Sequence, residues 1–318
     1  MTLTKIEFKP GIQKQTSDLG AAGGYVDCDN VRFRYGLPEK IGGWDKTTTN
    51  TLIGVARDAH HWVALDGTRL AALGTDKKLY IYANDLLYDI TPTRQTNTAV
   101  SSIFTTTNGS PNVTVNVNGH GANEGDIVTF SGTTSLSGTS FTAENFDRSF
   151  EIQSVTGTNA FVIQQDANET TGTVTTGTAT ATFDINSAPA SSTFGYGWGT
   201  STWNTETWST PRSSSSVTLN GRDWSIDNFG ELMIATALDG STFQWSPTSD
   251  GLSGKASAVT NAPTTSKFSL VSTPDRHLIL FGTEKTIGTG GSQDPLLLRF
   301  SSQEDINTYE PRATNTAG

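Results

Sequence analysis

Short stretches in which apolar and polar residues alternate recur along most of this chain. In the stretch 25–36, Val31, Phe33 and Tyr35 alternate with two arginines, which is the period-two pattern of a strand with one buried and one charged face. Long periodic runs of Ala, Leu, Glu and Lys, which long helices need, do not occur in the sequence. The pattern predicts an all-β protein.

One arrangement returns three times: a strand, a polar turn, an apolar strand, a second turn and a third strand. The copies cover residues 62–82, 224–245 and 268–300, and equivalent leucines in the last two lie 46 residues apart. Such periods with three or four strands per unit are typical of β-propeller blades. We expect four or five blades in residues 49–102 and 186–318, and therefore a partial propeller, either truncated or completed by a partner.

The stretch 103–185 differs from its surroundings, because it is rich in Thr and Gly and nearly free of Trp and Tyr. We expect it to form an inserted small β-barrel or sandwich domain. Residues 1–48 are predicted to form an extended N-terminal arm with two or three short strands and a closing turn at 37–43. The strands expected in the insert are 113–117, 127–130, 150–152, 161–163 and 179–185.

Tryptophans gather in the low-complexity stretch 189–216, where Trp198, Trp203 and Trp208 follow one another every five residues. This spacing fits neither a helix nor a strand, and a loop that lays its Trp side chains on a surface explains it most simply. Together with Trp44, these residues are candidates for a subunit interface, where Trp is enriched. Stacking on sugars is the alternative.

The formal net charge is −10, which argues against a protein that grips duplex DNA, since such binding needs clustered Lys and Arg. An acidic chain could still line a channel through which DNA slides. Arg32 and Arg34 are candidates for contacts in that lumen, or for ion pairs with nearby acids such as Asp27 or Asp29. Cys28 is the only cysteine, so the sequence offers no intrachain disulfide and suits a reducing compartment.

The first residues lack the pattern of a signal peptide, and no apolar stretch is long enough to cross a membrane. We expect synthesis in the host cytoplasm and no membrane anchor. The histidines have no metal-ligand spacing, and the adjacent His60 and His61 point to opposite faces of a predicted strand. Most aspartates sit in predicted turns, where Asp serves backbone hydrogen bonds. We therefore expect no catalytic residue, no cofactor site and no metal site.

The N-terminal motifs resemble a known family. They are Phe8 to Ile12, Gly24 to Arg34 and Pro38 to Trp44, followed later by Tyr88 to Pro92, the Gly-Trp run at 195–208 and Trp224 to Glu231. The sequence is similar in these stretches to podovirus tail nozzle or hub proteins, also called packaged-DNA stabilisation proteins.

The resemblance implies a homohexameric ring in the virion tail, below the portal and adaptor proteins, built around a β-propeller. It implies that the ring contacts tail fibres or a needle, retains the packaged DNA and lets it pass without tight binding. The resemblance implies no catalytic residue. Two other classes stay open: a receptor-binding, glycan-binding tail protein, and a polysaccharide depolymerase.

Overall fold

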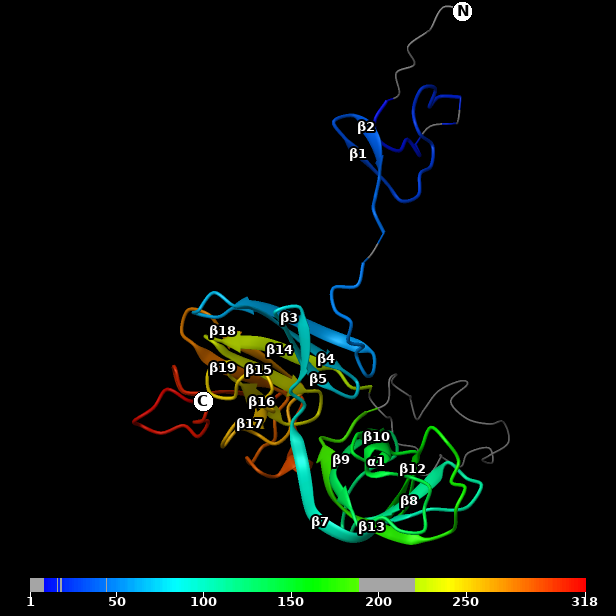
Figure 1. The fold of residues 1–318 in the computed structure, drawn as a ribbon. Coiled ribbons are helices and arrows are strands. Elements are labelled where there is room, and N and C mark those ends of the chain that lie inside the picture. Colours follow the sequence, from blue (N-terminus) through cyan, green and yellow to red (C-terminus); the bar gives the residue numbers. More distant parts are fainter. Residues whose placement is uncertain (1–8, 16, 18, 44, 189–220) are drawn as a thin grey trace, which may run out of the picture. The chain divides into compact units, whose positions relative to one another are not determined.

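The computed structural model describes residues 9–15, 17, 19–43, 45–188 and 221–318 (Figure 1). The chain divides into two compact units, Met1–Thr49 and Asn50–Gly318, and each is described by itself. Their strands pair in several antiparallel sheets. The described helical segments are one short α-helix, α1 (Ala143–Phe146), and one 3-10 turn, η1 (Gly290–Ser292). The prediction of an all-β protein is confirmed.

The first unit contains a hairpin of β1 (Val31–Arg34) and β2 (Leu37–Lys40). Its two turn residues, Tyr35 and Gly36, have positive φ angles of 50° and 79°, as the tight turns that suit a twisted hairpin require. The prediction of a turn over 37–43 is wrong, because β2 begins at Leu37 and runs through Pro38. A proline without an N–H fits there, since both strands of this hairpin are sheet edges.

In the described residues of the second unit, three sheets have strands that are adjacent in the chain and also neighbours in space. Sheet 1 consists of β3 (Ala56–Val63), β4 (Arg69–Thr75), β5 (Leu79–Ala83) and β6 (Leu86–Asp89). Sheet 2 consists of β14 (Trp224–Phe229), β15 (Leu232–Ala237), β16 (Thr242–Trp245) and β17 (Ser257–Ala258). Sheet 3 consists of β18 (Phe268–Ser272), β19 (His277–Phe281) and β20 (Leu298–Phe300).

Sheet 2 packs against sheet 1 with one face and against sheet 3 with the other, and the first strands β3, β14 and β18 lie side by side (Figure 1). The first interface buries Trp224 and Trp245 against sheet 1. Trp224 lies over Gly74, where an added Cβ would come within 2.5 Å of the indole Cδ1. Apolar area removed from water at these two interfaces holds the stack together.

The described residues form three stacked sheets, whereas the length of the chain led us to expect four or five blades, some of them in residues that lie outside the description. Two stretches counted toward the blades do not contribute to them in the described residues. The stretch after β20, residues 301–318, contains no strand. Residues 93–102 belong to another sheet, which is described next.

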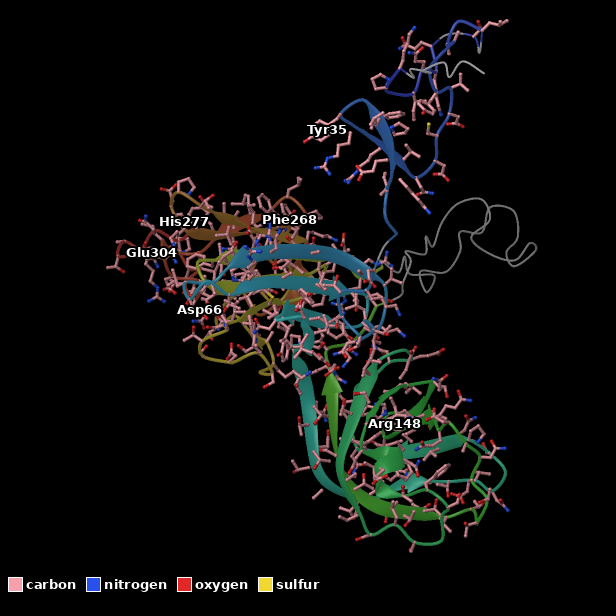
Figure 2. All side chains as sticks on the ribbon, turned by 45° about the horizontal axis from the view of Figure 1, so that its top comes forward. Tyr35, Asp66, Arg148, Phe268, His277 and Glu304 are labelled. Carbon is pink, nitrogen blue, oxygen red and sulfur yellow. The ribbon has the colours of Figure 1, made fainter. Side chains whose placement is uncertain are left out.

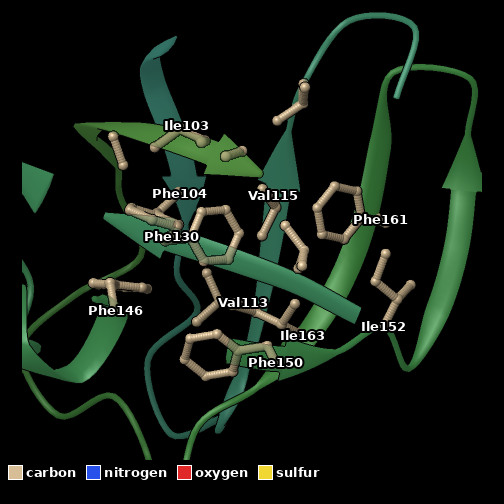
Figure 3. Close-up of a cluster of buried hydrophobic side chains, with 14 of the residues drawn as sticks. Ile103, Phe104, Val113, Val115, Phe130, Phe146, Phe150, Ile152, Phe161 and Ile163 are labelled. Carbon is tan, nitrogen blue, oxygen red and sulfur yellow. The ribbon is translucent and has the colours of Figure 1, made fainter. Parts of the chain in front are cut away.

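Between β6 and β14 lies a seven-stranded sheet of order β10-β9-β13-β7-β8-β12-β11, here called the small domain. Its core is a cluster of buried phenylalanines and branched aliphatic residues (Figure 3), with the rings of Phe104 and Phe146 stacked at 3.8 Å. Its strands are β7 (Thr93–Thr105), β8 (Asn112–Asn116), β9 (Ile127–Thr134), β10 (Ser149–Glu151), β11 (Ser154–Gly157), β12 (Ala160–Gln164) and β13 (Thr175–Asp184).

The strands β7 and β13 enter and leave the small domain and pair with each other along most of their length (Figure 1). Because β7 begins at Thr93, the sheet starts ten residues before the stretch 103–185 that differs in composition. Of the strands that the structure describes, those of this sheet pair only with one another. The strands β7 and β13 therefore form the covalent connection between the small domain and the stacked sheets.

Candidate functional surfaces

Polar side chains on β3 and β14, the first strands of sheets 1 and 2, bind the first strand of the sheet that follows. From sheet 1, Asp58 Oδ2 accepts a hydrogen bond from the backbone N–H of Ile226 at 2.9 Å. His60 Nε2 lies 2.8 Å from Asn228 Oδ1, which makes the histidine ring nitrogen the donor. These groups satisfy polar atoms at the free edge of β14, which has no strand partner on that side.

The same arrangement joins sheet 2 to sheet 3. Ser225 Oγ donates to the carbonyl of Ser269 at 2.6 Å, and the N–H of Ser269 returns a bond to that hydroxyl at 3.2 Å. Asp227 Oδ2 accepts from the N–H of Val271 at 2.9 Å. A polar seam therefore runs across the three first strands and fixes the register of one sheet on the next.

A buried lysine holds the small domain to the stacked sheets. The side chain of Lys78 is 2 % exposed, and its Nζ lies 2.6 Å from Asp184 Oδ2 at the end of β13 and 2.8 Å from Asp89 Oδ2 in β6. Lys255, from the loop after β16, binds the other oxygen of Asp89 at 2.9 Å. Two lysines and two aspartates thus balance each other where sheet 1, sheet 2 and the small domain meet.

The charges of this cluster affect one another. Burial acts to raise the pKa of Asp89, but Lys78 and Lys255 more than compensate and lower the pKa to about 2. Burial acts to lower the pKa of Lys78, but Asp184 and Asp89 together raise it above its ordinary value. Burial raises the pKa of Asp184. The cluster is an ionic junction in which Lys78 lies within ion-pair distance of both aspartates and Lys255 lies within ion-pair distance of Asp89.

A second set of contacts supports the same junction. Lys77 binds Glu151 of β10 at 2.5 Å. Asp126, which is 1 % exposed, accepts hydrogen bonds from Asn186 Nδ2 and from the N–H of Ser187, both at 2.7 Å. Arg222 donates to the carbonyl of Asn186. The chain that leaves β13 is therefore held both to the small domain and to the start of sheet 2.

Two other buried carboxylates bind loops rather than a ligand. Glu169 accepts hydrogen bonds from the Thr139 hydroxyl and from the N–H groups of Ser140, Thr170 and Thr171. Burial opposes ionisation of Glu169, but the Thr139 hydroxyl and the backbone donors lower its pKa to about 2. Glu284 binds the backbone and side chain of Thr264 in the same way. Both groups stabilise local structure.

Two of the histidines, His120 and His277, likewise form structural contacts. His120 is 1 % exposed, its Nε2 lies 3.0 Å from the Gly157 carbonyl, and its ring packs on Phe161. His277 Nδ1 lies 2.7 Å from the carbonyl of Ser301. Within the described part of the chain, no group of three or more His, Cys, Asp or Glu side chains is placed to hold a metal ion.

Of the candidate residues, Arg32 forms an ion pair, but its partner is Glu39 across the hairpin at 3.1 Å rather than Asp27 or Asp29. Asp27 is paired instead with Lys14, also at 3.1 Å. The guanidinium of Arg34 lies 5.5 Å from the centre of the Tyr35 ring. Trp44, Trp198, Trp203 and Trp208 lie outside the described residues, so their interface role stays a prediction.

The sequence did not single out the residues of the ionic junction. Lys78 and Asp184 are 106 positions apart. In the sequence, neither residue differs from the polar residues that are common at the ends of strands. The alternation Lys78-Leu79-Tyr80-Ile81-Tyr82 predicts the strand correctly. It contains no signal that its first residue is buried, because lysines are almost never buried unless they are paired.

No family model matches this sequence, and no curated protein matches it. Among solved structures, a distant match is phage phi92 endosialidase, with 14 % sequence identity and a TM-score of 0.22. The match covers 83 % of this chain and 47 % of that chain, so this chain spans about half the length of that protein. The described residues include no helix with the length and apolar character to span a membrane.

Proposed function

We propose that this chain is a structural component of a bacteriophage tail, a nozzle or hub ring that forms the DNA exit channel. The observation that carries the proposal is the resemblance of residues 8–12, 24–34 and 38–44 to podovirus tail nozzle proteins. In the proposed setting the chain forms a homohexamer in the virion. The ring contacts the portal and adaptor above it and tail fibres or a needle, and it retains the packaged DNA.

The proposal includes an architecture in which sheets 1 to 3 are blades of a β-propeller and the small domain is a barrel inserted into it. Support comes from three successive meander sheets whose first strands lie side by side, as the inner strands of propeller blades do. For the barrel, support comes from its edge strands β10 and β11, which follow one another directly in the chain.

The proposal also includes a non-enzymatic role. The described carboxylates and histidines with strong interactions bind backbone groups or lysines of the same chain, as Asp58, Asp184, Glu169 and His120 do. Such groups are already committed to structure and are not aimed at a substrate. Glycan binding, the second class, would depend on the tryptophans outside the described residues, and no described feature favours it.

Imaging of tagged protein in intact particles by cryo-electron microscopy tests this proposal. We expect an axial ring directly below the portal and adaptor. A peripheral position, at the tip of a fibre or spike, would contradict the nozzle role and favour receptor binding. Absence of the protein from purified particles would contradict both.

A further inference from the structure

A pocket of about 480 Å³ lies where the small domain meets sheet 2. Its walls come from the start of β7, the chain after β13, the segment before β14 and the hairpin of β15 and β16, and two arginines, Arg94 and Arg222, line it. Pockets that bind small molecules have volumes of about 300–1,000 Å³. The size therefore suits a small molecule and is too small for a DNA duplex.

Arg222, on the side of sheet 2, is a half-buried cation with few partners. It donates a hydrogen bond to the carbonyl of Asn186, and its guanidinium carbon lies 5.6 Å from the centre of the Trp224 ring. Burial lowers the pKa of Arg222, and the charge of Asp126 opposes that effect. Asp126 itself accepts hydrogen bonds from Asn186 and Ser187. The contacts of the described residues thus engage one of the five N–H donors of this guanidinium.

Arg94, on the side of the small domain, is also short of acceptors. Its Nη2 donates to the carbonyl of His120 at 2.9 Å, and its guanidinium carbon lies 5.6 Å from the centre of the Phe183 ring. Its Nε is buried and has no hydrogen-bond partner in the described part of the chain. A buried polar group without a partner costs free energy, and an anion beside the guanidinium would offset part of that cost.

The described arginines differ in how their charge is compensated. Four have a carboxylate at ion-pair distance: Arg32, Arg148 (labelled in Figure 2), Arg276 and Arg312. Three without such a carboxylate are exposed to water: Arg34, Arg57 and Arg69. The other three are half-buried and have none within the described residues: Arg94, Arg222 and Arg299. Arg299 binds two carbonyl groups, whereas Arg94 and Arg222 bind one each and share a pocket.

The charges around the pocket favour an anion. The charged residues that line it are Arg94, Arg222 and Asp239. The carboxylate of Asp239 is already bound, because its Oδ1 lies 2.5 Å from Lys267 Nζ and accepts a hydrogen bond from Gln293 at 3.1 Å. A cation withdrawn from water is stabilised by an anion paired with it. The two guanidiniums are therefore left with a net positive charge to be compensated.

We propose that this pocket binds the oxyanion group of a small molecule, a carboxylate or a phosphate, between Arg94 and Arg222. The planar guanidinium presents its N–H groups in a fork that matches both kinds of group. Apolar side chains that line the pocket beside the arginines, those of Ile185, Leu238 and Phe243, would pack on the remainder of the ligand. A single oxyanion is expected, because the net charge of −10 repels polyanions at long range.

A ligand held in this way would connect two parts of the fold. Arg94 is the second residue of β7, which enters the small domain, and Arg222 lies two residues before β14 of sheet 2. A ligand that binds the native state opposes its local opening. Hydrogen exchange is therefore expected to slow at the start of β7 and in the turn between β15 and β16 when the site is filled.

Isothermal titration calorimetry of the full chain tests the site, with sodium acetate and inorganic phosphate as probes at constant ionic strength. Saturable binding of acetate assigns a carboxylate ligand, and tighter binding of phosphate assigns a phosphate ligand; either result supports the site. Acetamide, the neutral counterpart of acetate, is expected not to bind. The full chain includes residues 189–220, and a pocket already filled by them would bind neither probe. Binding of neither probe would overturn the inference.

The variants Arg222→Met and Arg94→Met are each expected to weaken binding of the probe by roughly tenfold or more, because a hydrogen bond between charged groups is lost. Arg276→Met is the matched control. The guanidinium of Arg276 also lies over a ring, that of Phe229 at 5.1 Å, but it pairs with Glu304 outside the pocket, so this variant should bind like the unmodified chain.

Circular dichroism checks that each variant is folded. If Arg222→Met does not fold, Arg222→Lys takes its place, since lysine keeps the charge but lacks the planar fork, and it should also bind the probe less tightly. Unchanged affinity in the Arg94 and Arg222 variants would overturn the inference. None of these results would affect the nozzle role, which depends on the position of the protein in the particle.

Discussion

Replacement of Lys78 by Met is expected to destabilise the junction between the small domain and the stacked sheets. The variant keeps most of the side-chain volume but leaves Asp184, whose side chain is 4 % exposed, without its cation. Removing one partner of a buried ion pair costs about 3–5 kcal/mol, because the remaining charge stays buried and uncompensated. Since 1.4 kcal/mol is a factor of ten, local opening should increase by roughly two to nearly four powers of ten.

Lys255→Met is the matched control. It removes a lysine from the same aspartate, Asp89, but the side chain of Lys255 is 41 % exposed. Exposed pairs contribute about 0–1 kcal/mol, so this variant should change opening by less than roughly tenfold. The double variant Lys78→Met with Asp184→Leu removes both buried charges and should recover much of the loss, because apolar replacement of a buried pair is often neutral.

Native-state hydrogen exchange is the assay, read at the amides of β5 and β13, which hold Lys78 and Asp184 in place. Burial raises the pKa of Asp184, Lys78 opposes that effect most strongly, and without Lys78 the charge of Lys255 is left to oppose it. A carboxyl whose pKa is raised in the folded state lowers the free energy of unfolding at high pH, and this destabilisation disappears as the carboxyl is protonated. The loss of stability caused by Lys78→Met should therefore be larger at pH 8 than at pH 5. Equal exchange in Lys78→Met and Lys255→Met, or a loss independent of pH, would refute the reasoning.

Three further outcomes follow from the structure. Glu169→Gln should lower the free energy of unfolding of the small domain by about 1–3 kcal/mol, which urea unfolding can measure. Since the pKa of Glu169 is lowered to about 2, the stability that its carboxylate contributes is present above pH 4.5 and is lost as the pH falls toward 2. Gly74→Ala should destabilise the stacked sheets by about 1–3 kcal/mol, because the added methyl group overlaps with Trp224. The control Gly157→Ala has open space around the added methyl group and should cause no such loss. Thermal unfolding of both variants measures the difference. Gel-shift titration at low salt should find weak DNA binding, and submicromolar affinity with a steep salt slope would contradict it.

The strands with regular alternation could be predicted from the sequence, and β7 shows why others could not. Strands such as β4, β8 and β12 carry apolar residues that bury one face, so the alternation and the packing have one cause. The first ten residues of β7, from Thr93 to Ser102, are mostly polar and lack that signal. Their pairing with β13, some 80 positions later, makes them a strand. A partner so distant in sequence leaves no local trace.

The polar seam could not be predicted from the sequence for a related reason. Asp58, His60, Ser225 and Asp227 looked like ordinary polar positions of half-exposed strands. Their partners are backbone N–H and carbonyl groups or an amide of the next sheet, and backbone groups have no sequence signature. In the first unit, by contrast, the pairing of Arg32 with Glu39 follows directly once the two-residue turn at Tyr35 is known. The error there was to expect a turn where β2 lies.

Several positive charges in the described part of the chain are paired with its own carboxylates, which bears on how DNA would pass the proposed ring. Lys77 and Lys78 hold the small domain, Lys267 binds Asp239, and Arg32 binds Glu39. A phosphate that approached any of these cations would have to compete with a carboxylate already in place, so each contact would gain little free energy. Because affinity for DNA grows with the number of neutralised phosphates, a net charge of −10 together with these paired cations would keep that number small in the proposed ring. A duplex would then slide without friction from tight binding, and long-range repulsion from every subunit would centre it.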